Sequence, residues 1–187
     1  MIDLRDRELP NQIEIGGSFF HIKTDFRIWI EFGDMIRKEE TLMQMDISKI
    51  FEDEIPSEEY IVEIFEKLQE FFVNKNPTPN SSGGGSDERL FDYILDGEYI
   101  VGSFMQAYGI DLTSVNYMHW HLFKALFVSL PDNTKMSQIM SMRGYRKSKD
   151  DYDTSANKSK QAWKLPSITE LEKKEILDEI DEIFYNS

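Results

Sequence analysis

The sequence predicts a mainly α-helical protein that carries one small N-terminal β-hairpin. Apolar residues recur at three-and-four spacing through most of the chain, which is the period of one face of an α-helix. The dipeptide Gly16-Gly17 stands between two short alternating runs and is typical of a tight hairpin turn. Hydrophobic residues make up 40% of the sequence, which is enough apolar surface for a folded core.

The length of the chain favours one domain. At about 150 residues per domain, 187 residues correspond to a single helical domain over residues 1–187. Residues 1–73 alone would bury too little surface for secure independent stability. Residues 74–89 contain two prolines, three successive glycines and no hydrophobic anchor, so they are predicted to form a flexible loop. A two-lobed arrangement on either side of this loop is the alternative.

The first predicted elements are the hairpin, over about residues 12–23, and a helix over about residues 24–38. An isolated hairpin is only marginally stable in water, so it must pack against a larger element. Thr24 or Asp25 can cap the helix, because each side chain offers an oxygen to the free backbone N–H groups of the first turn. The apolar face of this helix carries Phe26, Trp29, Ile30 and Ile36.

A stronger helix is predicted over residues 57–73. Pro56 and Ser57 open it, and Glu58 and Glu59 suit the positive end of the helix dipole. Its apolar residues recur at helical spacing: Ile61, Ile64, Phe65, Leu68, Phe71 and Phe72.

Four further helices are predicted in the second half of the chain. The first spans about residues 92–108 and stops at Gly109. The second spans about 115–130, is capped by Thr113 or Ser114, and is apolar on most sides, which predicts a central position. The last two are expected at about 135–143 and at 168–185, where a capping box begins at Ser167.

The charge is unevenly distributed along the chain. The net charge of −14, from 35 acidic and 21 basic side chains, argues against general affinity for the phosphate backbone of nucleic acids. Residues 1–80 carry nine basic and eighteen acidic side chains, whereas residues 135–164 carry eight basic and three acidic ones, a net of +5. Within this basic segment, residues 148–160 contain almost no apolar side chains, so the sequence leaves open whether residues 146–164 are ordered or disordered.

The residues that could support catalysis or metal binding have simpler structural interpretations. His119 and His121 lie two positions apart, so on a helix they point in divergent directions and cannot share one tetrahedral metal ion. Asp92 and Asp96 stand at helical spacing, but among 35 acidic residues such pairs arise by chance and are interpreted as a solvated face. There is no cysteine, no phosphate-binding loop and no nucleophile elbow. We therefore expect no enzymatic activity, no metal and no cofactor.

The basic segment is the main candidate for contacts with a partner. Basic and aromatic side chains are interleaved there, and they are predicted to contact acidic helices of the same chain or of another subunit. Nucleic-acid contact is disfavoured, because three aspartates interrupt the run and the rest of the chain repels phosphate. The candidate partner contacts are Arg143, Tyr145, Arg146, Lys147 and Trp163. The opposite charges of this segment and of the terminal helix also suggest self-association.

Several stretches of the sequence resemble a known family. They are Thr24-Asp25-Phe26-Arg27 after the Gly-Gly hairpin, residues 103–112, residues 118–126, and Arg143 with Tyr145-Arg146. In these stretches the chain resembles the phage gene-product-fifteen family of tailed phages and prophages of Gram-positive bacteria. The resemblance covers about residues 10–165 and rests on aromatic and small residues, not on a catalytic signature. Its motif positions are interpreted as core residues: Phe104, Tyr108, Gly109, Trp120, Phe123 and Leu126.

The resemblance implies a protein of the tail-morphogenesis gene cluster, similar to tail assembly chaperones. Such proteins bind the tape-measure protein and other tail assembly proteins in the host bacterial cytoplasm and are absent from the finished virion. Met136, Met140 and Met142 would supply an adaptable apolar surface for a client, with ordinary core positions as the alternative. The other two hypotheses are a structural virion protein of the tail or head–tail junction, and a nucleic-acid-binding or regulatory phage protein.

No association with a membrane is expected. No run approaches the roughly 18 apolar residues of a membrane-spanning helix. The stretch from Met1 to Pro10 is charged and does not have the pattern of a signal peptide.

Overall fold

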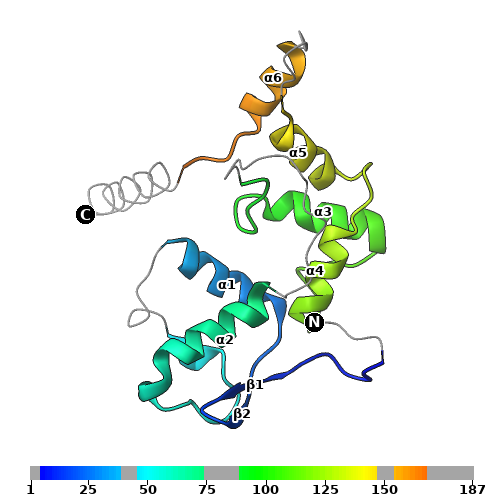
Figure 1. The fold of residues 1–187 in the computed structure, drawn as a ribbon. Helices are drawn as coiled ribbons and strands as arrows, with labels where there is room; N and C mark the ends of the chain where they lie inside the picture. Colours follow the sequence, from blue (N-terminus) through cyan, green and yellow to red (C-terminus); the bar gives the residue numbers. More distant parts are fainter. Residues whose placement is uncertain (1–4, 39–45, 74–88, 147–153, 168–187) are drawn as a thin grey trace, which may run out of the picture. The chain divides into compact units, whose positions relative to one another are not determined.

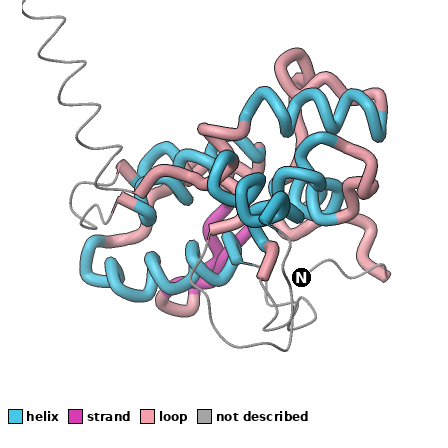
Figure 2. Tube along the Cα trace, turned by 90° about the horizontal axis from the view of Figure 1, so that it is seen from above, coloured by secondary structure: helices cyan, strands magenta, loops and turns pink. Residues whose placement is uncertain are grey.

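Helices dominate the part of the chain that the structure, a computed structural model, describes: residues 5–38, 46–73, 89–146 and 154–167. Six α-helices and one two-stranded antiparallel sheet lie in these ranges (Figures 1 and 2). The predicted fold class, mainly α with a small N-terminal hairpin, is confirmed. Among these residues, no helix combines the length and the apolar character needed to cross a membrane.

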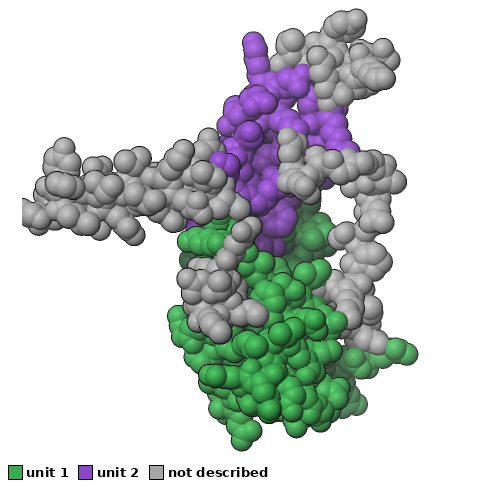
Figure 3. Space-filling model, turned by 60° about the vertical axis from the view of Figure 1, so that its left-hand side comes forward, with its two compact units in different colours: residues 1–84, 104–130 green, residues 85–103, 131–187 purple. Residues whose placement is uncertain are grey.

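The chain divides into two compact units, each made of two stretches of sequence (Figure 3). Unit 1 comprises residues 1–84 and 104–130, and unit 2 comprises residues 85–103 and 131–187. Because each unit draws on both halves of the sequence, neither corresponds to a lobe before or after the predicted loop at 74–89. The prediction of one domain over residues 1–187 stays a prediction.

Unit 1 begins with the β-hairpin. β1 (Gln12–Ile15) pairs with β2 (Ser18–His21), and Ile15 stands opposite Ser18. Gly16 and Gly17 form the turn with φ values of 57° and 79°, which glycine adopts without steric cost. The side chains of Ile13 and Ile15 are buried, and β1 packs against α2, which supplies the larger element that a hairpin requires.

The next helices of unit 1 follow the predicted boundaries closely. α1 spans Phe26–Arg37, and its N-cap is Asp25, whose side chain accepts the backbone N–H of Arg27. A short 3₁₀ helix, η1, covers Ile47–Lys49. A second one, η2 (Glu58–Tyr60), leads directly into α2 (Ile61–Val73), as the helix predicted over 57–73 requires. Almost all of the predicted loop, residues 74–88, lies outside the described residues.

α3 (Gly97–Tyr108) starts five residues later than predicted. Asp92 holds the preceding residues in a turn, because its side chain accepts the backbone N–H groups of Ile94 and Leu95, both at 2.9 Å. The helix ends where expected. Gly109 follows it with a φ of 67°, and its N–H donates to the carbonyl oxygen of Met105.

α4 (Trp120–Val128) also starts five residues later than predicted. The predicted caps, Thr113 and Ser114, instead bind the side chain of Asp111 in a separate turn. The N-cap of α4 is His119, whose Nδ1 accepts the backbone N–H of His121 at 3.0 Å. An imidazole nitrogen thus performs the role that the prediction had assigned to a hydroxyl group.

Unit 2 contains the first half of α3, together with α5 (Lys135–Gly144) and α6 (Thr154–Ala162). α5 agrees with the prediction, and the buried hydroxyl of Ser103 accepts the N–H of Met136 in its first turn. Within the segment 146–164, residues 154–162 form α6, and residues 147–153 lie outside the described residues. The residues of α6 form a helix because its alanine, lysine and glutamine residues are good helix formers and because α6 packs on α5. The predicted terminal helix at 168–185 lies outside the described residues.

Candidate functional site

Two of the stretches that carry the family resemblance lie side by side in unit 1. Residues 24–26 run antiparallel to residues 118–120: the N–H of Trp120 donates to the carbonyl of Thr24 at 2.7 Å, and the N–H of Phe26 donates to that of Met118 at 2.9 Å. The hydroxyl groups of Thr24 and Tyr117 are 2.6 Å apart. This pairing aligns the start of α1 with the start of α4.

Arg27 stabilises the turn that precedes α4 through hydrogen bonds to its backbone. Its guanidinium group binds the carboxylate of Asp25 at 3.1 Å and donates to the carbonyl oxygens of Leu112, at 3.1 Å, and Val115, at 2.7 Å. The resemblance of Thr24-Asp25-Phe26-Arg27 therefore has a structural meaning. Asp25 caps α1, and Arg27 connects that cap to residues 112–115.

The His-Trp-His stretch of α4 caps the C-terminal end of α2. The last carbonyl groups of a helix have no partner within the helix. Here the carbonyl oxygen of Phe72 accepts from Trp120 Nε1 at 3.0 Å and from the ammonium group of Lys124, and that of Phe71 lies 2.9 Å from His121 Nε2. The two histidines are thus structural, and no cluster of potential metal ligands occurs among the described residues.

Burial lowers the pKa values of both histidines. His119 Nδ1 accepts a backbone hydrogen bond, so its proton resides on Nε2, which lies 3.0 Å from the carbonyl oxygen of Pro10. His121 Nδ1 is buried, and no group of the described residues forms a hydrogen bond with it. Burial lowers the pKa of His121 from 6.5 to about 4 and also lowers that of His119. The pKa of Lys124, half-buried against the rings of Phe72 and Trp120, falls to about 8 for the same reason.

The folded protein should lose stability as the pH falls from 6.5 towards 4. In this window the unfolded chain protonates His121 and the folded chain does not, so the unfolded state binds more protons and is favoured. Between pH 7 and pH 5 we expect His121 to contribute a loss of about 2 kcal/mol in the free energy of unfolding. Urea denaturation at both pH values measures it. The dependence of the free energy of unfolding on pH should be weaker in His121→Gln and unchanged in His21→Gln, which replaces an exposed histidine. The same dependence in the wild-type chain and in both variants would contradict the assignment of this effect to His121.

A groove of about 660 Å³ opens in unit 1 beside the paired stretches. Its walls come from the segment before β1, the connection between β2 and α1, residue 52, and residues 117–122. Two large apolar side chains in the wall are exposed, Tyr117 to 55% and Leu122 to 42%. Charged side chains in the wall are mostly acidic. The lining residues are Glu8, Leu9, Asn11, Lys23, Thr24, Asp25, Glu52, Tyr117, Met118, His119 and Leu122.

The positions that the resemblance marked as core residues all lie in unit 1. Three of the six are fully buried: Phe104, Trp120 and Phe123. Tyr108 and Leu126 are half-buried, and the hydroxyl of Tyr108 donates to the carbonyl oxygen of Leu126 at 2.9 Å. Gly109 is exposed, and its positive φ explains the glycine.

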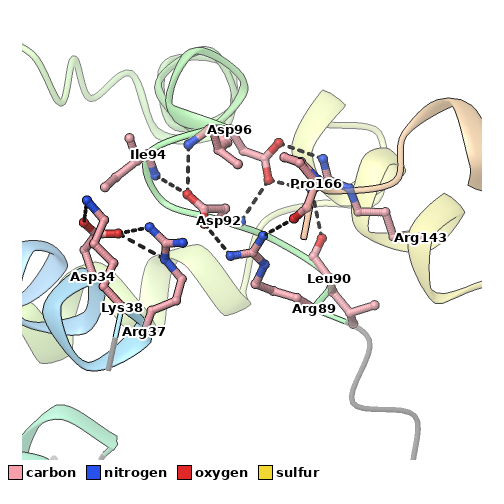
Figure 4. A network of polar contacts seen from close by, with 11 residues as sticks. Asp34, Arg37, Lys38, Arg89, Leu90, Asp92, Ile94, Asp96, Arg143 and Pro166 are labelled. Atoms are coloured by element: carbon pink, nitrogen blue, oxygen red, sulfur yellow. Dashed lines mark hydrogen bonds and ion pairs between the residues drawn. The ribbon is translucent and has the colours of Figure 1, made fainter. Parts of the chain in front are cut away.

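The acidic pair Asp92 and Asp96 is buried in unit 2, which corrects its interpretation as a solvated face (Figure 4). Asp96, 2% exposed, binds Arg143, 6% exposed, through two hydrogen bonds of 2.5 and 2.9 Å. Asp92 binds Arg89 at 2.9 Å. Sequence reasoning missed this network, because the cation that neutralises Asp96 lies 47 positions away in the chain.

The two arginines of this network also hold backbone groups of unit 2. Arg143 donates to the carbonyl oxygens of Trp163, at 2.6 Å, and Leu90, at 3.0 Å. Arg89 donates to that of Pro166 at 3.0 Å. These bonds attach the segment after α6 to the residues before α3.

The predicted partner contacts occupy different environments. Arg143 is engaged within unit 2. Trp163 is half-buried, with Tyr99 against its ring edge and the ammonium of Lys135 above its face, 4.6 Å from the centroid. Tyr145 is half-buried and Arg146 is exposed. Lys147 lies outside the described residues. Of the three methionines assigned to a client surface, Met136 is a core residue, whereas Met140 and Met142 are half-buried.

Comparison with known proteins gives one family. The model of the family described as Bacteriophage Gp15 protein matches residues 4–171 of the 187. Curated proteins and solved structures give no significant match. Proteins of this family are phage structural or morphogenesis proteins. The match includes most of both units, the groove and the buried network, and the chain therefore belongs to the Bacteriophage Gp15 protein family.

Proposed function

We propose that this chain is a non-catalytic phage tail assembly chaperone that binds the tape-measure protein in the cytoplasm of the host bacterium. The observation that supports this function is the groove of unit 1, where Tyr117 and Leu122 expose large apolar surfaces. A chaperone that holds an aggregation-prone client needs such a surface, and exposed apolar patches mark sites of protein interaction. The net charge of −14 keeps a protein with this surface in solution.

The same features make nucleic acid an unsuitable partner. The groove is lined mainly by acidic and apolar side chains. In the basic segment, Arg143 is buried on Asp96, and Lys160 donates to the carbonyl oxygen of Tyr145. Other tail assembly proteins and further copies of the chain are additional proposed partners, the latter because residues 135–164 are basic and residues 1–80 are acidic.

Co-expression with the tape-measure gene of the same phage tests the function. We expect the soluble fraction of the tape-measure protein to rise several-fold and the two proteins to co-purify, because the groove would shield apolar segments of the client. Tape-measure protein expressed alone, or with an unrelated protein of similar negative charge, is the control. Failure of the two proteins to co-purify would contradict the proposal.

The composition of the virion separates this function from that of a structural virion protein. A chaperone acts before assembly is complete and should be missing from purified particles by mass spectrometry. A fixed number of copies per particle would favour a structural protein of the tail or head–tail junction.

A further inference from the structure

We infer that the groove of unit 1 is the client-binding site, and that it receives a protein segment in which a large apolar side chain is flanked by lysine or arginine. This inference rests on the proposed function and adds to it the place of binding and the chemistry of the bound segment. It follows from two properties of the groove, its fixed apolar walls and its excess of negative charge, and from the sequence of α6, which lacks a matching apolar side chain.

The apolar walls of the groove are held in place before any client arrives. The ring of Tyr117 is exposed, but its hydroxyl is anchored 2.6 Å from Thr24 Oγ1. Leu122 projects from α4, whose first turn is fixed by the bond from Trp120 N–H to the carbonyl of Thr24. Binding to a pre-formed surface costs less conformational entropy than binding that orders the site. A large apolar side chain can therefore be received without rearrangement of these walls.

The charges at the groove favour a basic partner. Glu8 and Glu52 are exposed carboxylates in its wall, whereas Lys23 is the only cation that lines it in the described part of the chain. Asp25 is already paired with Arg27. Residues 1–80, from which most of the wall is drawn, carry a net charge of −9. Complementary charge selects partners and steers their approach, so lysine or arginine beside the apolar side chain suits this site.

The helix α6 of the basic segment does not offer the same combination to a second copy, and Tyr145, which precedes the exposed Arg146, is itself half-buried. α6, with the sequence Thr-Ser-Ala-Asn-Lys-Ser-Lys-Gln-Ala, contains no large apolar side chain. The nearby large aromatic residue, Trp163, already contacts Tyr99 and Lys135 inside unit 2. A different protein that carries both basic and apolar side chains is therefore the better occupant of the groove.

A photo-crosslinking amino acid at position 122 of the full-length chain tests the site directly. Val128 is the matched control: it lies on the same helix, is 71% exposed and does not line the groove. In the co-purified complex with the tape-measure protein, we expect crosslinks from position 122 at least five-fold more abundant than from position 128. The crosslinked client peptides should contain lysine or arginine next to a large apolar residue.

A charge reversal tests the electrostatic part. Glu52→Lys changes the wall of the groove, whereas Glu54→Lys changes the net charge equally at an exposed residue outside it. We expect Glu52→Lys to reduce client retention at least five-fold and Glu54→Lys to change it less than two-fold. Equal effects of the two variants, equal crosslinking from positions 122 and 128, or crosslinks mainly to a second copy of this chain would overturn the inference.

A second probe separates failure of the site from failure of the chaperone function. A labelled peptide with a central tryptophan between two lysines should bind the wild-type chain, and Glu52→Lys should weaken it at least five-fold. A peptide with glutamates in place of the lysines should bind at least five-fold more weakly. If the tape-measure protein does not co-purify but the peptide behaves in this way, the groove binds basic, apolar segments and the tape-measure protein is not its client. If neither peptide nor client depends on the groove, the inference fails.

Discussion

Replacing Arg143 by alanine is expected to lower the free energy of unfolding by about 3–5 kcal/mol, because it leaves the buried carboxylate of Asp96 without its cation. The substitution also removes the donors to the carbonyl oxygens of Leu90 and Trp163. Urea denaturation followed by circular dichroism measures the loss. Arg146→Ala, which removes an exposed arginine three residues away, should change stability by less than about 1 kcal/mol.

A double-mutant cycle distinguishes the loss of the ion pair from a general disturbance of α5. The double variant with Arg143→Met and Asp96→Leu removes both charges together and leaves neither one buried and unpaired. It should be less destabilised than the sum of the two single variants, by at least about 1 kcal/mol. Strictly additive single effects would show that Arg143 and Asp96 do not act as a pair.

Phe123→Ala is expected to destabilise the protein by about 3–5 kcal/mol, because it opens a cavity in the aromatic core of unit 1. The ring of Phe123 is 1% exposed and stacks on those of Phe26, Phe104 and Trp120 with centroids 4.7, 5.3 and 5.8 Å away. Thermal and urea denaturation should both show the loss.

The exposed aromatic residue Phe19 on β2 provides the control for this change. Phe19→Ala removes the same atoms from a side chain that is largely in solvent, so its effect should stay within about 1 kcal/mol. Phe123→Leu should recover part of the stability lost in Phe123→Ala, since it refills some of the volume. A Phe123→Ala protein as stable as Phe19→Ala would show that the stacked rings do not form a close-packed core.

The elements that the sequence predicts well are those with a local signal. Gly16 and Gly17 mark the hairpin turn, and Asp25 caps α1 through its own neighbouring backbone. The apolar period of residues 61–73 is that of one helix face. In each of these cases the residues that determine the structure are close together in the chain, so a short window of sequence contains the physical cause.

The features that sequence reasoning missed depend on distant residues. Asp92 and Asp96 have the same spacing whether they face water or a buried guanidinium group, and Arg143 is far away in the sequence. α4 starts at Trp120 because His119 is its N-cap. Histidine is not one of the residues that commonly cap a helix, so the sequence contains no ordinary capping signal at this position. The groove brings together residues 8 and 122, and no local pattern indicates it. The spacing of Asp92 and Asp96, one helical turn apart beside residues of mixed polarity, is the one weak signal in the sequence that could have indicated their buried network with Arg89 and Arg143.

The end of α2 has a practical consequence for attaching reporters to this protein. The carbonyl groups of Phe71 and Phe72, near its end, accept hydrogen bonds from Trp120, His121 and Lys124, which belong to α4. The hydrogen bonds of these two carbonyl groups therefore come from a helix that lies about 50 positions away in the chain. An affinity tag, an epitope or a protease recognition sequence inserted among residues 74–88 should leave these bonds from α4 in place, which makes this stretch a suitable point for labelling the protein.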